Sequence, residues 1–323
     1  MPLGEEMGII FLTYLNRSGS TYLANLLSSS KDIIACPEAE ILVNLFLEDP
    51  YGRYYPPEKN RREYLLSLLQ TDPKLKFWNL DPEVLDQVNS SARNMDQFLN
   101  ILVRYRDRIK PGAGILLFKA ERLIHLVSNI MSEPVGINTS FIALVRDPRA
   151  VFDSQKRTVS PLNGKPMSTH PVNTAIQWRE FARLCRGYEK LPGFNLVQFE
   201  DLILSGNEVM TRLCERLRLD PSSIKPGYGD LYERIPPDHR PIHESILKGP
   251  LPGKTGEWKQ QLTRNETRLI EQTAGVKMSY YGYARIYPSR YLYLNIIRII
   301  REILYFVVAW LRKAVYHFRK IYE

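Results

Sequence analysis

The chain has 323 residues, of which 44% are hydrophobic and 24% are charged, and it carries a formal net charge of +9. These values are ordinary for a folded protein with a substantial core in one large or two small domains, and they exclude a disordered chain. The positive charge favours an anionic ligand, an anionic glycan or a membrane surface; nucleic acid would fit the charge, but no nucleic-acid motif is present and we expect no such partner.

The N-terminus and the cysteines indicate the compartment. Residues 1–6 are acidic and lead almost directly into an apolar run, so the sequence predicts no signal peptide. The cysteines Cys36, Cys185 and Cys214 are few, widely spaced and without C-x-x-C spacing, which favours a reducing compartment. We therefore expect a cytoplasmic protein.

The first predicted element is a strand followed by a turn and a helix, between residues 8 and 27. Ile9–Leu12 has the length and composition of a strand buried on both faces. Asn16–Thr21 is a polar turn with one glycine, and apolar residues then recur at helical spacing from Tyr22. Such a unit aims backbone N–H groups and the positive end of a helix at one point, which predicts an anion site.

The side chains of this turn strengthen the prediction. Arg17 offers the donors of its guanidinium group, and Ser18, Ser20 and Thr21 offer hydroxyls. The turn is not a Walker A loop, because a second glycine and a lysine before the hydroxyl residue are missing. The alternative is that Arg17 and the serines only cap a helix. By itself the turn predicts a phosphate-like ligand.

The elements that follow alternate between strand and helix. Further strands are expected at residues 32–36, 115–118, 141–145 and 194–199, and helices at 123–131 and 172–191. Residues 41–113 are expected to form a mostly helical insertion. The alternation predicts an α/β fold with a P-loop-like, doubly wound parallel sheet flanked by helices, whose ligands bind beyond the carboxyl ends of the strands.

Carboxylates after the second predicted strand are candidates for a proton acceptor. Glu38 and Glu40 follow that strand, beside the first turn, where a carboxylate is well placed to take a proton. The alternative is that both only supply negative charge to a helix N-terminus. Lys119 lies at the end of the next predicted strand. It could contact the leaving oxygen of a group that is transferred at this site, or it could form a structural ion pair with Glu121.

A second polar cluster follows the strand predicted at 141–145. Asp147 is placed to cap the next helix and Pro148 to occupy its first position. Arg146 then lies at the carboxyl end of the strand, and Ser154 lies about two turns along the helix. Together they could bind a second, separate phosphate. The alternative is an ordinary capped junction in which Arg146 pairs with Asp147.

The histidines show no partner spacing. We expect structural or surface positions for His125, His170, His239 and His243.

The last 35 residues form an unusual segment, 289–323, in which apolar and aromatic residues alternate with basic ones. Its uninterrupted apolar run, Ile303–Leu311, is far shorter than the ~20 residues of a membrane span. A basic amphipathic helix rich in aromatics predicts binding at a membrane interface, here the inner face. The alternative is a helix docked on its own domain or on a second subunit, as in a homodimer. We divide the chain into an α/β domain, 1–288, and this C-terminal helix.

The two anion clusters together resemble the two cofactor motifs of the sulfotransferase family. They lie about 130 residues apart, in a strand–Arg17-Ser18-Gly19-Ser20-Thr21–helix unit and a strand–Arg146-Asp147-Pro148–helix unit. In that family the first loop holds the 5′-phosphosulfate of 3′-phosphoadenosine-5′-phosphosulfate (PAPS), and the second holds its 3′-phosphate. More weakly, Lys254–Lys259 is similar to the loop that closes over the nucleotide, and Phe199–Leu202 to the family's Y-E-D-L.

The resemblance implies a set of cofactor residues. For the 5′-phosphosulfate it implies Arg17, Ser18, Gly19, Ser20, Thr21 and Tyr22. For the 3′-phosphate it implies Arg146 and Ser154, and for the closing loop Lys254, Thr255, Gly256, Trp258 and Lys259. Which of Lys254 and Lys259 acts there stays open. Arg17 stands where cytosolic members carry a lysine, and this arginine form is usual in the carbohydrate and protein-tyrosine branches.

The reaction implied is in-line transfer of a sulfuryl group from PAPS to an acceptor hydroxyl, with adenosine 3′,5′-bisphosphate (PAP) as the product and no metal. Such a transfer needs positioned donors for the leaving phosphate and a base for the attacking hydroxyl. The branches closest to this first loop use a glutamate as the base. Glu38 lies 21 residues after Arg17, the spacing expected for the tyrosylprotein type, and Glu40 is the alternative.

As the acceptor we expect a hydroxyl of a glycan or glycolipid, with a peptide tyrosine or a small molecule as alternatives. Two other classes stay open, an ATP-dependent P-loop kinase and a non-catalytic nucleotide-binding protein associated with a membrane. Residues that bind the acceptor are expected mainly from 31–110 and from loops such as 159–171.

Overall fold

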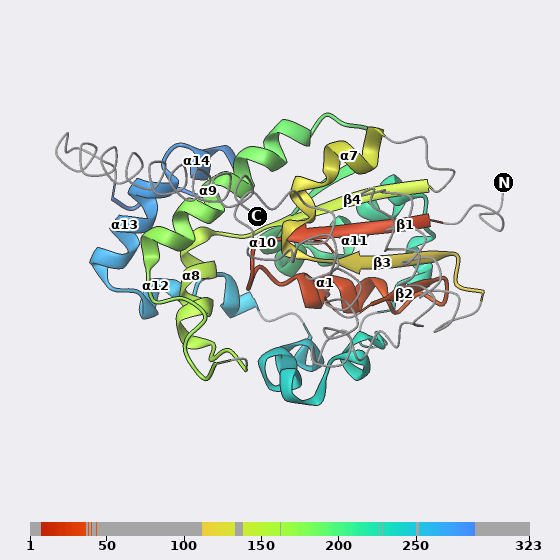
Figure 1. The fold of residues 1–323 in the computed structure, drawn as a ribbon, viewed down its shortest axis with the longest axis horizontal. Helices are drawn as coiled ribbons and strands as arrows, with labels where there is room; N and C mark the ends of the chain where they lie inside the picture. Colours follow the sequence, from red (N-terminus) through yellow and green to blue (C-terminus); the bar gives the residue numbers. More distant parts are fainter. Residues whose placement is uncertain are drawn as a thin grey trace, which may run out of the picture.

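Five parallel strands form the centre of the structure, a computed structural model that describes residues 8–36, 38, 40, 43, 112–132, 138–161, 163–225, 227, 229–249 and 252–287. The strand order is β2-β3-β1-β4-β5 (Figure 1). The strands are β1 Gly8–Tyr14, β2 Ile33–Ala35, β3 Ile115–Lys119, β4 Asn138–Val145 and β5 Phe194–Gln198. The predicted doubly wound parallel sheet is therefore confirmed.

Strand β1 lies in the middle of the sheet because its side chains are apolar on both faces. Phe11 pairs in register with Phe118 of β3 and with Phe141 of β4. Alternate residues of a strand point to opposite faces. Accordingly, Ile9 and Phe11 belong to one buried cluster, whereas Ile10 and Leu12 belong to another on the opposite side. The sheet thus separates two hydrophobic cores.

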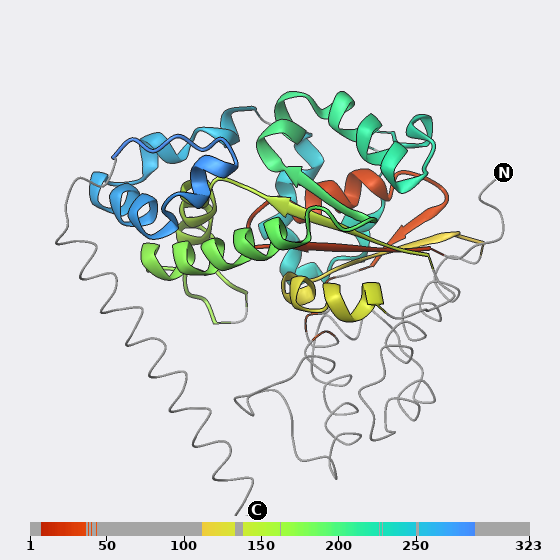
Figure 2. The same cartoon turned by 90° about the horizontal axis from the view of Figure 1, so that it is seen from above.

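Helices cover both faces of the sheet, as Figure 2 shows from above. One core is shared with α1 Ser20–Leu27, α10 Phe199–Leu204 and α11 Gly206–Leu217. The other is shared with α7 Val127–Ser132, α9 Pro171–Tyr188 and α14 Lys277–Tyr280. The remaining elements are η2 Glu121–His125, α8 Pro148–Arg157, η3 Pro221–Ser223, η4 Leu231–Arg234, η5 Pro237–Lys248, η6 Pro252–Thr255, α12 Trp258–Gln261 and α13 Arg264–Ala274.

The helix expected at 123–131 is divided into two elements, η2 and α7. Thr13 of β1 explains the division, since its hydroxyl donates to the carbonyl of Glu121 at 3.0 Å and accepts from the N–H of Ile124 at 3.1 Å. These bonds hold η2, the first turn of the expected helix, in the tighter 3₁₀ form, which is common at helix ends. The helix expected at 172–191 is confirmed as α9 and ends at Tyr188.

Two predicted segments fall outside the described residues. The helical insertion at 41–113 is described only at Val43, Gly112 and Ala113, and the C-terminal helix at 289–323 is not described at all. The division into these segments therefore stays a prediction. In the ranges that are described, we find no helix with the length and apolar character needed to cross a membrane.

Candidate active site

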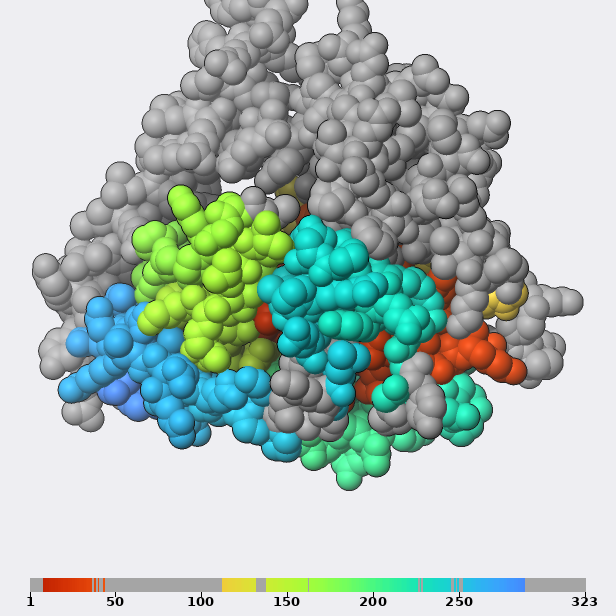
Figure 3. Space-filling view, turned by 90° about the horizontal axis from the view of Figure 1, so that it is seen from below, coloured from red at the N-terminus to blue at the C-terminus, as the bar shows by residue number. Residues whose placement is uncertain are grey.

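A cavity of about 1340 Å³ lies at the carboxyl ends of the strands. Parallel pairing brings these ends to one edge of the sheet, so Tyr14 after β1, Lys119 of β3 and Arg146 after β4 all line it. One wall is formed by α8 and residues 158–170, and the other by η4 and η5. These two walls meet on one face of the molecule, where part of the N-terminal segment is visible between them (Figure 3).

The first turn has the backbone of an anion loop. Gly19 has a φ of 92°, a conformation that side chains rarely adopt, and a Cβ added there would lie 2.3 Å from the Phe199 ring. Only glycine fits this position. Helix α1 begins at the next residue, so its first N–H groups have no intrahelical partner and face the loop. Ser20, Thr21 and Tyr22 line the cavity, whereas Ser18 is buried and is not among the lining residues.

Arg17 places its guanidinium group inside the cavity, with a backbone φ of 73°. Its Nε donates to Oγ of Ser154 at 3.2 Å, and its Nη1 donates to the carbonyl of Ile242 at 3.1 Å. Burial, followed by the positive charges of Arg146 and Arg157, lowers the pKa of Arg17 to about 10. The guanidinium group stays charged at neutral pH, in surroundings where cations repel each other and an anion would be stabilised.

Arg146 connects two loops at the cavity, the first loop at Asn16–Thr21 and the late loop at Lys254–Lys259. Its Nη1 donates to the carbonyl of Arg17 at 2.9 Å, and its Nη2 donates to the carbonyl of Lys254 at 3.0 Å. The side chain is 8% exposed, and its Nε makes no hydrogen bond to any described residue. The two clusters found in the sequence therefore lie at one cavity rather than at two.

The junction at Asp147 is only partly as expected. Asp147 caps α8 by accepting from the N–H of Arg149 at 2.9 Å, and Pro148 takes the first helical position. The carboxylate of Asp147 pairs with the guanidinium of Arg149 at 2.6 Å, so the pair that we considered with Arg146 is replaced. This pairing leaves Arg146 directed at the two loop carbonyls.

The segment Phe199–Leu202 supports both loops. The ring of Phe199 packs under Gly19 and lies 4.4 Å from the guanidinium carbon of Arg146. Glu200 accepts a hydrogen bond from the N–H of Asp147 at 3.0 Å. This segment therefore orients Arg146 without lining much of the cavity by itself.

The late loop contributes a lysine to the cavity. Lys254 lines the cavity and pairs with Glu257 at 2.9 Å. Thr255, Gly256, Trp258 and Lys259 are not among the lining residues. Trp258 is buried, and the guanidinium carbon of Arg149 lies 4.0 Å from its ring centroid. Of the two candidate lysines, the structure thus brings Lys254 to the cavity.

Arg157 is a cation of the cavity that the sequence analysis missed. It lies three residues after Ser154 on the same face of α8 and lines the cavity. Its Nη2 contacts Glu257 at 3.1 Å and also Asp153. The sequence could have indicated this residue, because a position three residues after Ser154 lies on the same face of the predicted helix.

The two candidate glutamates have different surroundings. Glu38 lines the cavity, and its carboxylate lies 3.5 Å from Nζ of Lys119, which in turn is 3.4 Å from Oγ1 of Thr21. Glu40 instead accepts the N–H groups of Glu121 and Arg122, at 2.8 and 3.0 Å. It therefore caps η2, which is the structural role considered for both. The ion pair of Lys119 that we expected with Glu121 is formed with Glu38.

A group of buried carboxyls lies beside this pair. Burial, and then the charge of Glu38, raise the pKa of Glu40 to about 7. Burial, and then the charges of Glu40 and Glu38, raise the pKa of Glu121 to about 8. Asn16 of the first loop donates a hydrogen bond to Glu121. The negative charge near Glu38 is thereby reduced at neutral pH, because these two carboxyls hold protons more readily than free glutamates do.

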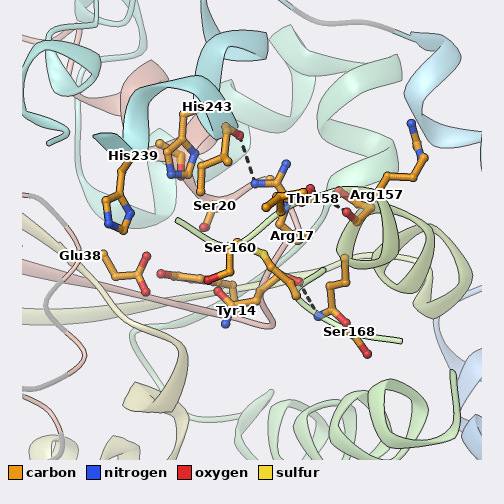
Figure 4. A pocket seen from close by; sticks show the side chains of 18 of the residues that line it. Tyr14, Arg17, Ser20, Glu38, Arg157, Thr158, Ser160, Ser168, His239 and His243 are labelled. Atoms are coloured by element: carbon orange, nitrogen blue, oxygen red, sulfur yellow. Dashed lines mark hydrogen bonds between the residues drawn. The ribbon is translucent and has the colours of Figure 1, made fainter. Parts of the chain in front are cut away.

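The outer walls carry many groups that form hydrogen bonds. Residues 158–168 form a hairpin in which the N–H of Ser160 donates to Lys165 at 2.8 Å and that of Met167 to Thr158 at 2.9 Å. Three of the histidines line the cavity, which the sequence did not indicate: His170, which is exposed, His239, which is buried, and His243. Two of these belong to η5, and Figure 4 shows them on the opposite side of the cavity from Arg157. His125 is exposed.

Metal and thiol chemistry have few candidates here. Across the described part of the chain, no group of three or more His, Cys, Asp or Glu residues could hold a metal ion. The three cysteines are buried and free.

Comparisons with known proteins agree with this geometry. The model of a family described as "Sulfotransferase family" matches residues 10–222. Among solved structures, the sulfotransferase domain from the curacin biosynthetic pathway has a TM-score of 0.56 and 19% identity, covering 86% of this chain and 98% of that one. The sulfotransferase domain of the olefin synthase from Synechococcus PCC 7002 has a TM-score of 0.50 and 21% identity, covering 84% and 95%. A search of curated sequences finds no significant match.

Proposed function

The chain belongs to the sulfotransferase family, and we propose that it transfers a sulfuryl group from PAPS to a hydroxyl of a glycan or glycolipid. One observation carries the cofactor assignment. Arg17, Arg146, Ser154 and Lys254 line a single cavity and are linked by hydrogen bonds through the first and late loops. A nucleotide with phosphates at two ends needs such a pair of cationic turns at one rim of the sheet.

The residues present fit this cofactor. Five cationic side chains line the cavity: Arg17, Lys119, Arg146, Arg157 and Lys254. Further donors are the Nε of Arg146, which has no hydrogen-bond partner among the described residues, and the N–H groups at the start of α1. We assign the 5′-phosphosulfate to the loop at 17–22 and the 3′-phosphate to Arg146, Ser154 and Lys254. The ATP-dependent kinase has no comparable support, because the lysine of a Walker loop is missing.

The residues that carry out the transfer lie near the carboxyl ends of the strands. When bound, PAPS supplies an activated sulfuryl group. Glu38 takes the proton of the acceptor hydroxyl, because it lies at the cavity surface next to the loop. Lys119 holds the Glu38 carboxylate and contacts Thr21 of the loop, so it sets the position of the base relative to the donor site. Arg17 and the loop N–H groups stabilise the charge on the leaving phosphate.

The outer walls support a polyhydroxylated acceptor. Ser160, Ser168, Asn173 and His239 line the cavity and can each donate or accept a hydrogen bond. Neutral hydrogen-bonding groups of this kind suit sugar hydroxyls, whose recognition depends on many directional contacts. A peptide tyrosine and a small molecule remain the alternatives. Membrane binding through 289–323, a homodimer and a lipid-linked acceptor stay predictions from the sequence.

The nucleotide assignment predicts a selective effect of Arg146. In the Arg146→Ala variant we expect PAP to bind more weakly by about 1.5–3 kcal/mol, the value for hydrogen bonds to charged groups, whereas AMP should bind nearly as before. Titration calorimetry with both nucleotides measures this difference. Arg183→Ala, which removes an exposed arginine paired with Glu180, is the matched control and should leave both affinities unchanged. Equal losses for PAP and AMP in Arg146→Ala would contradict the 3′-phosphate assignment.

The acceptor class is tested by following the label of sulfate-labelled PAPS. We expect wild-type protein to transfer label to glycan or glycolipid fractions of the source cell and to leave tyrosine peptides unlabelled. Label on the peptides alone would reject the glycan assignment. Absence of label in every fraction, from protein that binds PAP, would favour a non-catalytic nucleotide-binding protein.

A further inference from the structure

Tyr14 presents a buried hydroxyl to the cavity at the end of β1. The residue is 1% exposed and lines the cavity. Among the described residues its hydroxyl makes no hydrogen bond of normal geometry, and the neighbouring hydroxyl of Ser20 acts on it as a donor toward the phenol oxygen. Buried hydroxyls nearly always have a partner, because burying one without a partner is unfavourable. The phenol proton of Tyr14 therefore has no acceptor among the described residues, which indicates an acceptor on a ligand within the cavity.

The neighbours of this hydroxyl include the proposed base and a residue of the loop proposed to hold the phosphosulfate. Glu38 faces Tyr14 in the close view (Figure 4), and its charge acts on the phenol. Nζ of Lys119 lies 5.4 Å from the ring centroid, and Ser20 of the anion loop is a neighbouring hydroxyl. Tyr14 thus lies between the loop proposed to hold the phosphosulfate and the base proposed to face the acceptor.

Tyr14 is suited to donate a hydrogen bond. Burial, and then the negative charges of Glu38, Glu40 and Glu121, raise the pKa of Tyr14 well above its usual value. The phenol therefore keeps its proton at neutral pH. A neutral O–H donates a stronger hydrogen bond to a negatively charged oxygen than to a neutral one.

We infer that the Tyr14 hydroxyl donates a hydrogen bond to an oxygen of the sulfuryl group that is transferred, an inference that rests on the proposed function. In the transfer, the acceptor oxygen forms a bond to sulfur, and the bond from sulfur to the bridging phosphate oxygen breaks with its electron pair going to the phosphate. Glu38 takes the acceptor proton. Tyr14 keeps its own proton throughout and stabilises the negative charge on the sulfuryl oxygens.

The inference makes Tyr14 a residue that distinguishes PAPS from PAP, since PAP lacks the sulfuryl group. A Tyr14→Phe variant removes the hydroxyl and keeps the ring beside Lys119. Without acceptor, calorimetry should show PAPS binding weakened about 10-fold, the loss typical of one hydrogen bond to a charged group, and PAP binding unchanged within twofold. With acceptor, kcat should fall about 10²-fold, as for removal of one oxyanion donor.

A matched control removes a phenol hydroxyl elsewhere. The Tyr188 hydroxyl contacts Ser128 at 3.1 Å, and Tyr188 is not among the residues lining the cavity. Tyr188→Phe should equal wild type in both affinities and in kcat.

The possible outcomes separate this inference from the proposed function. Wild-type protein that binds neither nucleotide would reject both. If wild type binds both nucleotides, the inference is rejected by unchanged PAPS affinity in Tyr14→Phe or by equal losses for PAPS and PAP. A higher acceptor KM at unchanged kcat and unchanged PAPS affinity would instead place Tyr14 at the acceptor, and would also reject it.

Discussion

Glutamine in place of Glu38 should lower kcat by about 10²- to 10⁴-fold, the contribution typical of a positioned general base. The amide cannot take the proton of the acceptor hydroxyl, but it keeps the size of the side chain. Affinity for PAP should stay near that of wild type, because the carboxylate pairs with Lys119 and is not among the groups assigned to the two phosphates, which are the loop at 17–22, Arg146, Ser154 and Lys254. Steady-state transfer kinetics and PAP calorimetry on the same preparation measure the two quantities.

Glu40→Gln is the matched control for this variant. Glu40 is two residues further along the chain, and its carboxylate caps η2 by accepting two backbone N–H groups. Its replacement should act mainly on the melting temperature, because one amide oxygen cannot replace both carboxylate oxygens. Full activity in Glu38→Gln together with a large loss of kcat in Glu40→Gln would show that Glu40, and not Glu38, is the general base.

Removal of the Arg17 side chain should impair both binding and transfer. In Arg17→Ala we expect kcat to fall by about 10²- to 10³-fold, as for loss of a group that stabilises the leaving oxygens, and PAP affinity to fall as well. The guanidinium group is buried in the cavity and donates to Ser154 and to the carbonyl of Ile242. Its loss therefore removes a cation and also loosens η5 from the first loop.

Arg17→Lys tests whether charge alone is sufficient. Lysine keeps the positive charge but not the planar fork that reaches Ser154 and Ile242 together, so we expect an activity between those of wild type and Arg17→Ala. The φ of 73° is equally unfavourable for arginine, lysine and alanine, so backbone strain does not distinguish the variants. PAP affinity in Arg17→Ala equal to that of wild type would show that this loop does not hold the phosphosulfate.

The structure distinguishes neighbouring candidates more sharply than the sequence does. The spacing from Arg17 favoured Glu38 with Glu40 as the alternative, and the structure places Glu38 at the cavity and Glu40 at the start of η2. Lys254 and Lys259 are likewise distinguished by their position relative to the cavity, which only Lys254 lines. Each pair is separated by a few residues, and which member faces the site depends on turns whose geometry the residue pattern does not specify.

Local features were predicted well from the sequence because their causes are local. An apolar run bounded by polar residues suffices to indicate β1 and β4, and an Asp-Pro pair suffices to indicate the capped start of α8. The turn proposed to bind the phosphosulfate was recognisable as a strand–turn–helix unit from a short stretch, since the strand, the glycine and the hydroxyls are adjacent in the chain.

Contacts between distant residues were decided by the tertiary structure. Arg146 reaches Lys254 across 108 positions of sequence, and Arg17 reaches Ile242 across 225. The buried hydroxyl of Tyr14 and the histidines of η5 come to line one cavity only when parallel pairing aligns the strand ends and η5 folds over them. Periodicity and capping report on neighbours within a few residues, whereas a shared cavity depends on how whole elements pack.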